Sequence, residues 1–160
     1  MRVTALTFDG YAAGKTAFPG DVGAGVSDET WAGLNKATST MASLVAAPPA
    51  QGHYLSIVII GHSDLNDTNG LTLAQRRASE QQSAVDRATA AWDSIKLSVS
   101  EKATAMGAVA GQWWETSQNI TWALVYAGIG QPKFGSPINE DERSANRRVV
   151  VLISEFPPPV

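Results

Sequence analysis

The hydrophobic and polar positions along the chain divide it into strands and helices. Val3–Phe8 alternates as a first strand, and Tyr54–Ile60 is a nearly unbroken apolar run that predicts a second, buried strand. Ile120–Ala127 and Val149–Ile153 predict the last two strands. The second and last strands are apolar at nearly every position, so both faces of the sheet should be covered. Either a glycine-rich loop at 10–25 or another subunit could cover the second face.

Helical periodicity marks two long stretches between these strands. Ser27-Asp28-Glu29 has the composition of a helix start, and apolar residues then recur at spacings of three and four as far as Pro48-Pro49. The second helix has a seam formed by Ala74, Ala78, Gln81, Val85, Ala88, Trp92 and Ile95. Four charged residues lie off this seam: Arg76, Glu80, Arg87 and Asp93.

A third helix is predicted between the second helix and the third strand. The second helix is expected to end near Lys96, because Ser98-Val99-Ser100-Glu101 has the pattern of a capping box. The inserted helix, within 97–119, would carry Trp113 on its own seam, as part of the core rather than of a sugar-stacking platform with Trp114. Glu140–Ala145 predicts one helical turn before the last strand.

This order of elements predicts an α+β fold, an α/β sandwich with helices packed on a small sheet. The 160 residues are most simply one domain, residues 1–160, because neither an internal repeat nor a domain linker is visible. Hydrophobic residues make up 44% and charged residues 17% of the chain, which is a globular composition.

Charge and composition exclude several classes of partner. The formal net charge of −3 gives no basic surface for nucleic acid. The absence of cysteine excludes disulfides and thiolate metal sites. No apolar run approaches the roughly 20 residues that cross a bilayer, so direct membrane insertion is not expected. Met1–Gly10 is too short and too polar for a signal peptide, so the sequence predicts a protein made in the cytoplasm, which works there or leaves as part of something larger.

The candidate chemistry lies where the second strand meets the second helix. Gly61-His62-Ser63-Asp64 ends the strand, and Arg77 follows in the opening turns of the helix. One interpretation is an ion pair between Asp64 and Arg77 that locks strand to helix. The other is a site for a zwitterionic ligand, because a carboxylate can bind an ammonium group and an arginine can bind a carboxylate bidentately.

Four segments together resemble a known family. Gly61-His62-Ser63-Asp64, Leu73-Ala74-Gln75-Arg76-Arg77-Ala78, Gly128-Ile129-Gly130-Gln131-Pro132 and Asn146-Arg147-Arg148-Val149 are similar to motifs of the OmpA-like C-terminal domain, whose relatives include the peptidoglycan-associated lipoprotein and the flagellar stator MotB. Residues 54–153 match best, whereas 1–53 hold a diverged first strand, loop and helix, and 97–119 are an insertion. The resemblance implies the order β-α-β-α-(α)-β-β around a small mixed sheet.

The same resemblance implies a ligand. Domains of this family bind peptidoglycan through the diaminopimelate of its stem peptide, and the corresponding roles would fall on Asp64 and Arg77. The predicted ligand-binding residues, all within these motifs, are Asp64, Arg77, Ser63, Asn146 and Arg148. Either Arg147 or Arg148 is expected to pair with Asp141 or Glu142, since strand alternation sends the two arginines to opposite sides.

Two chemical alternatives are weaker. His53, His62 and Asp64 could be metal ligands, but two histidines without cysteine or a close spacing motif make a poor site. Ser63 and His62 do not predict a hydrolase, because neighbouring strand residues point to opposite faces and no Gly-x-Ser-x-Gly turn surrounds the serine. We therefore expect neither catalysis nor a cofactor or metal.

The sequence predicts a non-catalytic peptidoglycan-binding module that anchors a larger assembly to the cell wall. The expected partners are the peptidoglycan stem peptide and other subunits of that assembly. The alternative is a structural subunit of a phage tail, a baseplate or a contractile injection particle, in which the fold serves protein–protein contacts.

Overall fold

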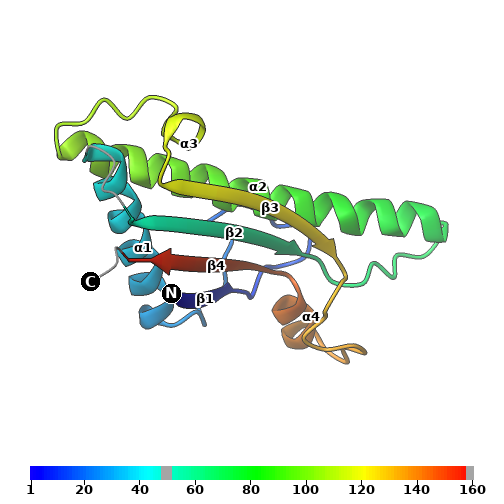
Figure 1. The fold of residues 1–160 in the computed structure, drawn as a ribbon. Coiled ribbons are helices and arrows are strands. Elements are labelled where there is room, and N and C mark those ends of the chain that lie inside the picture. Colours follow the sequence, from blue (N-terminus) through cyan, green and yellow to red (C-terminus); the bar gives the residue numbers. More distant parts are fainter. Residues whose placement is uncertain (48–51, 158–160) are drawn as a thin grey trace.

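The computed structural model describes residues 1–47 and 52–157, and it confirms the predicted α+β class. Within these residues four strands and four helices follow one another in the order β1, α1, β2, α2, α3, β3, α4, β4 (Figure 1). The strands are β1 (Arg2–Phe8), β2 (Tyr54–His62), β3 (Ile120–Gly128) and β4 (Arg148–Phe156). The helices are α1 (Asp28–Ala46), α2 (Leu73–Ala105), α3 (Trp113–Thr116) and α4 (Glu140–Asn146).

The four strands form one mixed sheet in the order β1-β4-β2-β3. Strand β4 pairs antiparallel with both β1 and β2, whereas β2 and β3 run parallel. The parallel pair needs a long crossover, and α2 with α3 supplies it. Strands β2 and β4 are therefore the inner strands, hydrogen-bonded on both sides.

Helices α1 and α2 cover one face of the sheet and bury the core against it (Figure 1). Strand residues on this face, such as Ile57, Ile59 and Val151, are fully buried. They belong to one cluster with residues of the two helices, including Met41 and Trp92. Helix α1 begins at an N-cap, where the Ser27 side chain accepts a hydrogen bond from the Thr30 amide. It ends at Ala46, and the prolines at 48 and 49 lie outside the described residues.

Helix α2 is one continuous helix of 33 residues, so the predicted end near Lys96 is wrong. The reason is packing: Val99 and Ala103 are fully buried and extend the seam of Trp92 and Ile95. The capping box that forms lies at the other end, where Thr72 and Gln75 exchange side-chain to backbone hydrogen bonds.

A separate helix does precede β3, but it spans only Trp113–Thr116. Trp113 is buried as predicted, with its indole edge-on to Trp92 and its Nε1 donating to the Ser100 hydroxyl at 3.2 Å. Trp114 lies beside it at the margin of the core.

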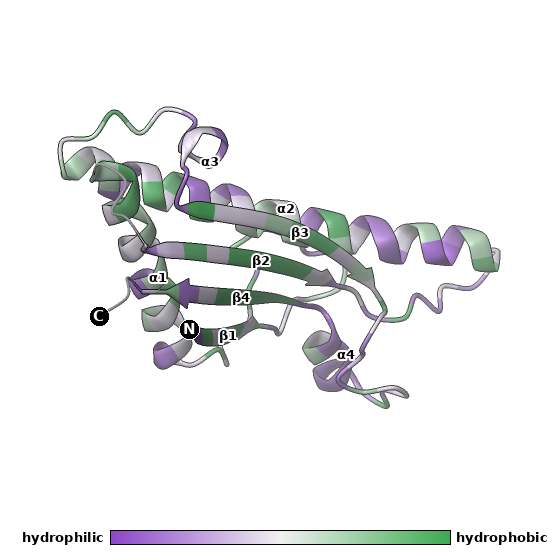
Figure 2. Ribbon diagram, viewed as in Figure 1, coloured by the Kyte–Doolittle hydropathy of each residue, from purple (hydrophilic) through white to green (hydrophobic). Residues whose placement is uncertain are grey.

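The second face of the sheet is not covered by the glycine-rich loop. The loop lies on the helical side, where Phe18 packs edge-on against Phe8, a core residue, and also against Trp31 of α1. Figure 2 views the sheet from the other side and shows hydrophobic residues along β2, β3 and β4 with no described helix in front of them. The prediction that the glycine-rich loop covers the second face is therefore wrong.

Candidate functional site

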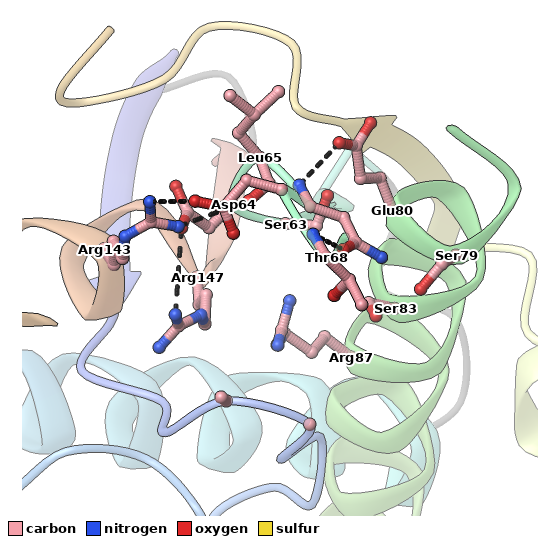
Figure 3. Close-up of a pocket in the computed structure, with 14 residues that line it drawn as sticks. Ser63, Asp64, Leu65, Thr68, Ser79, Glu80, Ser83, Arg87, Arg143 and Arg147 are labelled. Atoms are coloured by element: carbon pink, nitrogen blue, oxygen red, sulfur yellow. Dashed lines mark hydrogen bonds and ion pairs between the residues drawn. The ribbon is translucent and has the colours of Figure 1, made fainter. Parts of the chain in front are cut away.

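The candidate site is a cavity at the end of the sheet where the parallel strands β2 and β3 finish. It has a volume of about 270 Å³ (Figure 3). The Ser63 amide donates to the Gly128 carbonyl at 2.7 Å, which holds the chain just after β2 against the end of β3. The charged residues that line the cavity are Asp64, Asp67, Glu80, Arg87, Arg143 and Arg147. Three guanidinium groups and three carboxylates thus share a small volume.

Asp64 is the buried carboxylate of this cavity, with its side chain only 4% exposed. Its Oδ1 accepts a hydrogen bond from the Asn146 amide at 3.0 Å. Its Oδ2 accepts from Arg143 at 3.2 Å and lies 3.7 Å from the Arg147 guanidinium. A buried carboxylate needs such partners, because burial of an unpaired charge costs far more than burial of a neutral polar group.

Arg143 joins the buried carboxylate to the surface loop. It projects from α4, and its second terminal nitrogen donates to Asp67 at 2.6 Å. This hydrogen bond lowers the pKa of the Asp67 carboxyl below its ordinary value and raises the pKa of Arg143. Figure 3 shows Arg143 directed toward Asp64.

Arg147 lies at the end of α4 and pairs with Glu140 at the beginning of the same helix. The hydrogen bond from Arg147 lowers the pKa of the Glu140 carboxyl. The sequence predicts an acidic partner in this segment, but at Asp141 or Glu142. Arg147 donates to the Tyr11 carbonyl and to Glu140, whereas Arg148 donates to the carbonyls of Asn146 and Gln131, in agreement with their predicted separation.

Arg87 reaches the cavity from α2 and is almost fully buried, at 1% exposure. It donates to the His62 carbonyl at 2.8 Å and to the Lys15 carbonyl at 3.1 Å, and its guanidinium lies over the Tyr11 ring. Burial lowers the pKa of Arg87 to about 10, so it stays protonated at neutral pH. Arg87 thereby ties the glycine-rich loop to the end of β2.

Ser63 lines the cavity with a hydroxyl that has no hydrogen-bond partner among the described residues. The residue is 4% exposed. A buried polar group without a partner costs about 1–3 kcal/mol, and a ligand that supplies a partner recovers this cost. The hydroxyl is therefore a second indication that the cavity accommodates a polar molecule.

Arg77 does not form the predicted ion pair with Asp64. It donates to Glu80, one turn further along α2, at 2.7 Å, and its side chain is 48% exposed. The Glu80 side chain is buried and also accepts from the Asn66 amide at 2.7 Å, so it is held in place as a nearer carboxylate. Arg143, instead of Arg77, is the arginine that pairs with Asp64.

The other predicted residues are divided between two places. Asn146 supports Asp64 from behind the cavity and also exchanges two hydrogen bonds of 2.8 Å with the Phe134 backbone. Arg148 points elsewhere, donating to the carbonyls of Gln131 and Asn146, and lines a separate hollow with Lys133. Of the five predicted residues, Ser63 and Asp64 line the cavity, Asn146 contacts Asp64, and Arg77 and Arg148 do not line it. Their roles in ligand binding stay predictions.

Sequence reasoning missed Arg87, Arg143 and Glu80. Arg87 and Glu80 were placed off the apolar seam of the second helix, yet both are buried. A signal for Arg143 existed, since it precedes Arg147 by four residues, which is one helical turn. No comparable local pattern marks Arg87, because its partners are carbonyl groups of segments distant in sequence.

The two histidines lie at opposite ends of β2. His53 faces Glu155 at 3.3 Å, whereas His62 Nδ1 donates to the Gly130 carbonyl at 2.9 Å. Burial, with a smaller effect of Arg148, lowers the pKa of His62, so this imidazole is neutral at pH 7. Among residues 1–47 and 52–157 no group of three potential metal ligands comes together.

No described helix is both long and apolar enough to cross a membrane.

No protein-family model and no curated protein matches the sequence. Several solved structures are similar to it. The periplasmic domain of Helicobacter pylori MotB has 15% identity and a TM-score of 0.41, with 96% of this chain and 83% of that chain covered. The cell wall anchor of the T6SS from Pseudomonas aeruginosa has 19% identity and a TM-score of 0.40, with 94% and 80% covered. The OmpA-like domain of FopA1 from Francisella tularensis has 13% identity and a TM-score of 0.42, with 99% and 77% covered. MotB and OmpA-like domains are also what the four sequence motifs resemble.

Proposed function

We propose that the chain is a non-catalytic peptidoglycan-binding module that holds the diaminopimelate of a stem peptide and anchors an assembly to the cell wall. The observation that carries the proposal is the cavity beside Asp64, in which acidic and basic side chains are closely interleaved. The end of a diaminopimelate side chain is a zwitterion, and a zwitterion needs one group of each sign within a few ångströms. The sequence motifs support the same ligand.

The ammonium group of the ligand would pair with Asp64 or Asp67, and its carboxylate with Arg143. Arg143 bridges these two aspartates in the structure. Asp67 is the partner that can yield, because its side chain is 62% exposed and can be hydrated when it leaves. The ion pair between Arg143 and Asp67 would then be replaced by an ion pair between Arg143 and the ligand carboxylate. Because no buried charge is left without a partner, the desolvation cost of binding stays small. The Ser63 hydroxyl can complete the ligand's hydrogen bonds.

The size of the cavity supports a small ligand group. Pockets for drug-sized molecules hold roughly 300–1,000 Å³, and this cavity of about 270 Å³ lies just below that range. It can take the end of one amino acid, with the remaining stem peptide and the glycan outside. The half-exposed Arg77, near the mouth through Glu80, is available to such an outer part of the ligand.

Sedimentation with purified sacculi tests the proposal. Asp64→Asn keeps the shape of the side chain but removes its charge, and we expect it to abolish sedimentation, as we expect for Arg143→Gln. The matched control is Asp93→Asn, an exposed carboxylate on α2 that pairs with Lys96 away from the cavity. If wild type does not sediment, peptidoglycan binding is wrong. If Asp64→Asn binds like wild type, the site is wrong.

Ligand chemistry is tested separately by competition. A soluble stem peptide that contains diaminopimelate should release the protein from sacculi. The same peptide with lysine in its place should not, because the lysine side chain keeps the ammonium group but lacks the carboxylate. Equal release by both peptides would contradict recognition of the zwitterionic end. A module without catalysis should leave the stem peptides intact. Mass spectrometry after prolonged incubation with sacculi should therefore detect no released fragments.

The second candidate is a structural subunit of a larger particle such as a phage tail or injection device. The observation that favours it is the apolar outer face of the sheet, which a protein partner can bury. A chain that fails to bind sacculi yet enters a stable complex with neighbouring subunits would support this candidate instead of the first.

A further inference from the structure

The face of the sheet that is turned away from α1 and α2 carries three neighbouring rows of uncharged side chains, and beyond the third row the same side continues with His62 and Arg148. The strand register defines these three rows. The rows are Val3-Ser154-Ser56-Thr121, Ala5-Leu152-Val58-Ala123 and Thr7-Val150-Ile60-Val125. A fourth pair, Tyr54 and Phe156, borders them. We call this surface the outer face. Its middle row is wholly apolar, and the polar residues of the other two rows are serines and threonines.

The outer face is incompletely buried. Its central residues Val58, Ile60, Val150 and Leu152 are half-buried, partly by one another, and Ala5, Ala123 and Val125 are exposed. In Figures 1 and 2 no described helix or loop lies across these strands. A sheet with one face in water normally alternates between apolar and polar residues. Here the intervening row, Leu6-Val151-Ile59-Leu124, is also apolar, so both faces have the composition of an interior.

We propose that a second copy of this chain covers the outer face, so that two sheets pack face to face in a symmetric dimer. Two observations favour an identical partner. The three rows carry no charge, so a copy can meet them without burying or opposing a charge there, although each chain carries a net charge of −3. A twofold axis also brings the same surface from each copy into contact. With the axis near the middle row, Val58 and Leu152 of one copy lie against the same residues of the other.

The area of the outer face is sufficient for such a dimer. With strands about 4.8 Å apart and a rise of about 3.3 Å per residue, four strands of the length of β1 cover roughly 450 Å². Two copies bury about twice this area, and the bordering Tyr54 and Phe156 bring the total to roughly the 1,000 Å² that a specific interface needs. Sheets packed in this way lie about 10 Å apart, with their side chains interdigitated. We expect the dimer to dissociate on dilution, because weak and transient complexes lie at this low end of the size range.

The proposal is independent of the ligand at Asp64. The charged cavity lies beyond the ends of β2 and β3, among α2, α4 and the glycine-rich loop, whereas the outer face lies on the opposite side of the sheet from α1 and α2 (Figures 1 and 3). A dimer without peptidoglycan binding, or peptidoglycan binding without a dimer, would each separate the two proposals.

Analytical ultracentrifugation over a range of concentrations tests the dimer. We expect wild type to shift from monomer to dimer as the concentration rises, and Leu152→Lys to weaken dimerisation at least tenfold. Leu97→Lys is the matched control, because this leucine is 61% exposed on α2 and lies outside the outer face. Its dimerisation should equal that of wild type. A wild type that stays monomeric at every concentration, or a Leu152→Lys variant that dimerises like wild type, overturns the proposal.

Cross-linking decides the question even if Leu152→Lys does not fold. The chain has no cysteine, so a single introduced thiol reports its own surroundings. Ser56→Cys places the thiol on the outer face, and Ser43→Cys places it on the exposed side of α1. A short bis-maleimide should link two Ser56→Cys chains and leave Ser43→Cys monomeric. Absence of linked Ser56→Cys chains, or equal linking of both variants, contradicts a face-to-face dimer.

Discussion

Asp64 is the residue at which strand β2, helix α4 and the surface loop at Asp67 meet. Its two oxygens are shared between Asn146 and Arg143, and Arg143 extends the connection to Asp67. One guanidinium thus satisfies a buried and an exposed carboxylate at once. An ammonium group at the same position could not hold two carboxylates in one plane, because only arginine has the planar fork.

Replacing Arg143 tests this geometry in the protein itself. We expect Arg143→Gln to destabilise the fold by about 1 kcal/mol, a modest value because half of the interaction is with an exposed aspartate. Urea denaturation gives the change in the free energy of unfolding. Arg143→Lys should recover part of the stability but not the binding of sacculi. Full recovery of binding by lysine would show that charge alone is sufficient.

His62 makes stability depend on pH. Burial lowers its pKa in the folded state below the ordinary value near 6.5, so below that value the unfolded chain takes up more protons than the folded one. Stability from this residue is present above pH 6.5 and falls as the pH decreases towards the folded pKa. We therefore expect the melting temperature of wild type to fall below pH 6.5, and that of His62→Gln to fall less in the same range. Carboxylates such as Asp67, whose pKa is also lowered, lose their contribution only at more acidic pH. Identical pH profiles for the two proteins would contradict this assignment.

At the scale of elements, the close contact between β2 and α2 depends on Gly61. A Cβ at this position would lie 1.9 Å from the Ala84 carbonyl oxygen, which is far inside van der Waals contact. The strand and the helix can pack this closely only because Gly61 has no side chain. The same contact brings Arg87 within hydrogen-bonding distance of the His62 carbonyl.

Gly61→Ala should therefore destabilise the protein by at least about 1–3 kcal/mol, the range for overpacked interiors. Gly25→Ala is the matched control, because a Cβ there meets no atom within 4 Å and the backbone is not in the left-handed region. Thermal or urea unfolding of the two variants measures the difference. Equal stability of the two variants would show that α2 can move away from β2 at little cost.

The sequence predicted the strands well, and it predicted the helix boundaries and the charged partners less well. Strand positions followed from apolar runs, which are local. The end of α2 was placed near Lys96 because Ser98–Glu101 fits a capping box, but the decision rests on Val99 and Ala103, whose burial depends on the tertiary fold. Arg77 and Asp64 were paired because the end of the second strand and the opening turns of the next helix are close in sequence, whereas the observed pairing with Arg143 joins residues 79 positions apart. Such partners cannot be read from spacing.

At the scale of the whole molecule, the charged cavity and the outer face occupy different sides of one two-layer fold. The apolar pattern of the strands anticipated that the second face would be covered, and the arrangement in Figure 2 leaves it available to a partner chain. If both proposals hold, a dimer presents two cavities at once. Binding of two sites to one polymer raises the apparent affinity by about 10²–10⁴ without any new contact.

Leu152→Lys tests this combination. We expect the variant to bind a soluble, monovalent stem peptide as wild type does, since Leu152 lies outside the cavity. Its retention on intact sacculi should nevertheless fall by at least tenfold, because only one cavity engages at a time. Calorimetry with the soluble peptide and dilution-induced release from sacculi give the two values. A parallel loss in both assays would indicate damage to the cavity instead.

The position of β2 within the sheet has a mechanical consequence. Asp64 directly follows β2, and β2 is hydrogen-bonded along its length to β4 on one side and β3 on the other. Tension applied to Asp64 along the strand would shear both ladders, so their hydrogen bonds would share the force instead of opening one after another. Under the proposed function, a module that anchors an assembly to the cell wall needs this resistance to pulling, and an inner strand supplies it where an edge strand would peel away.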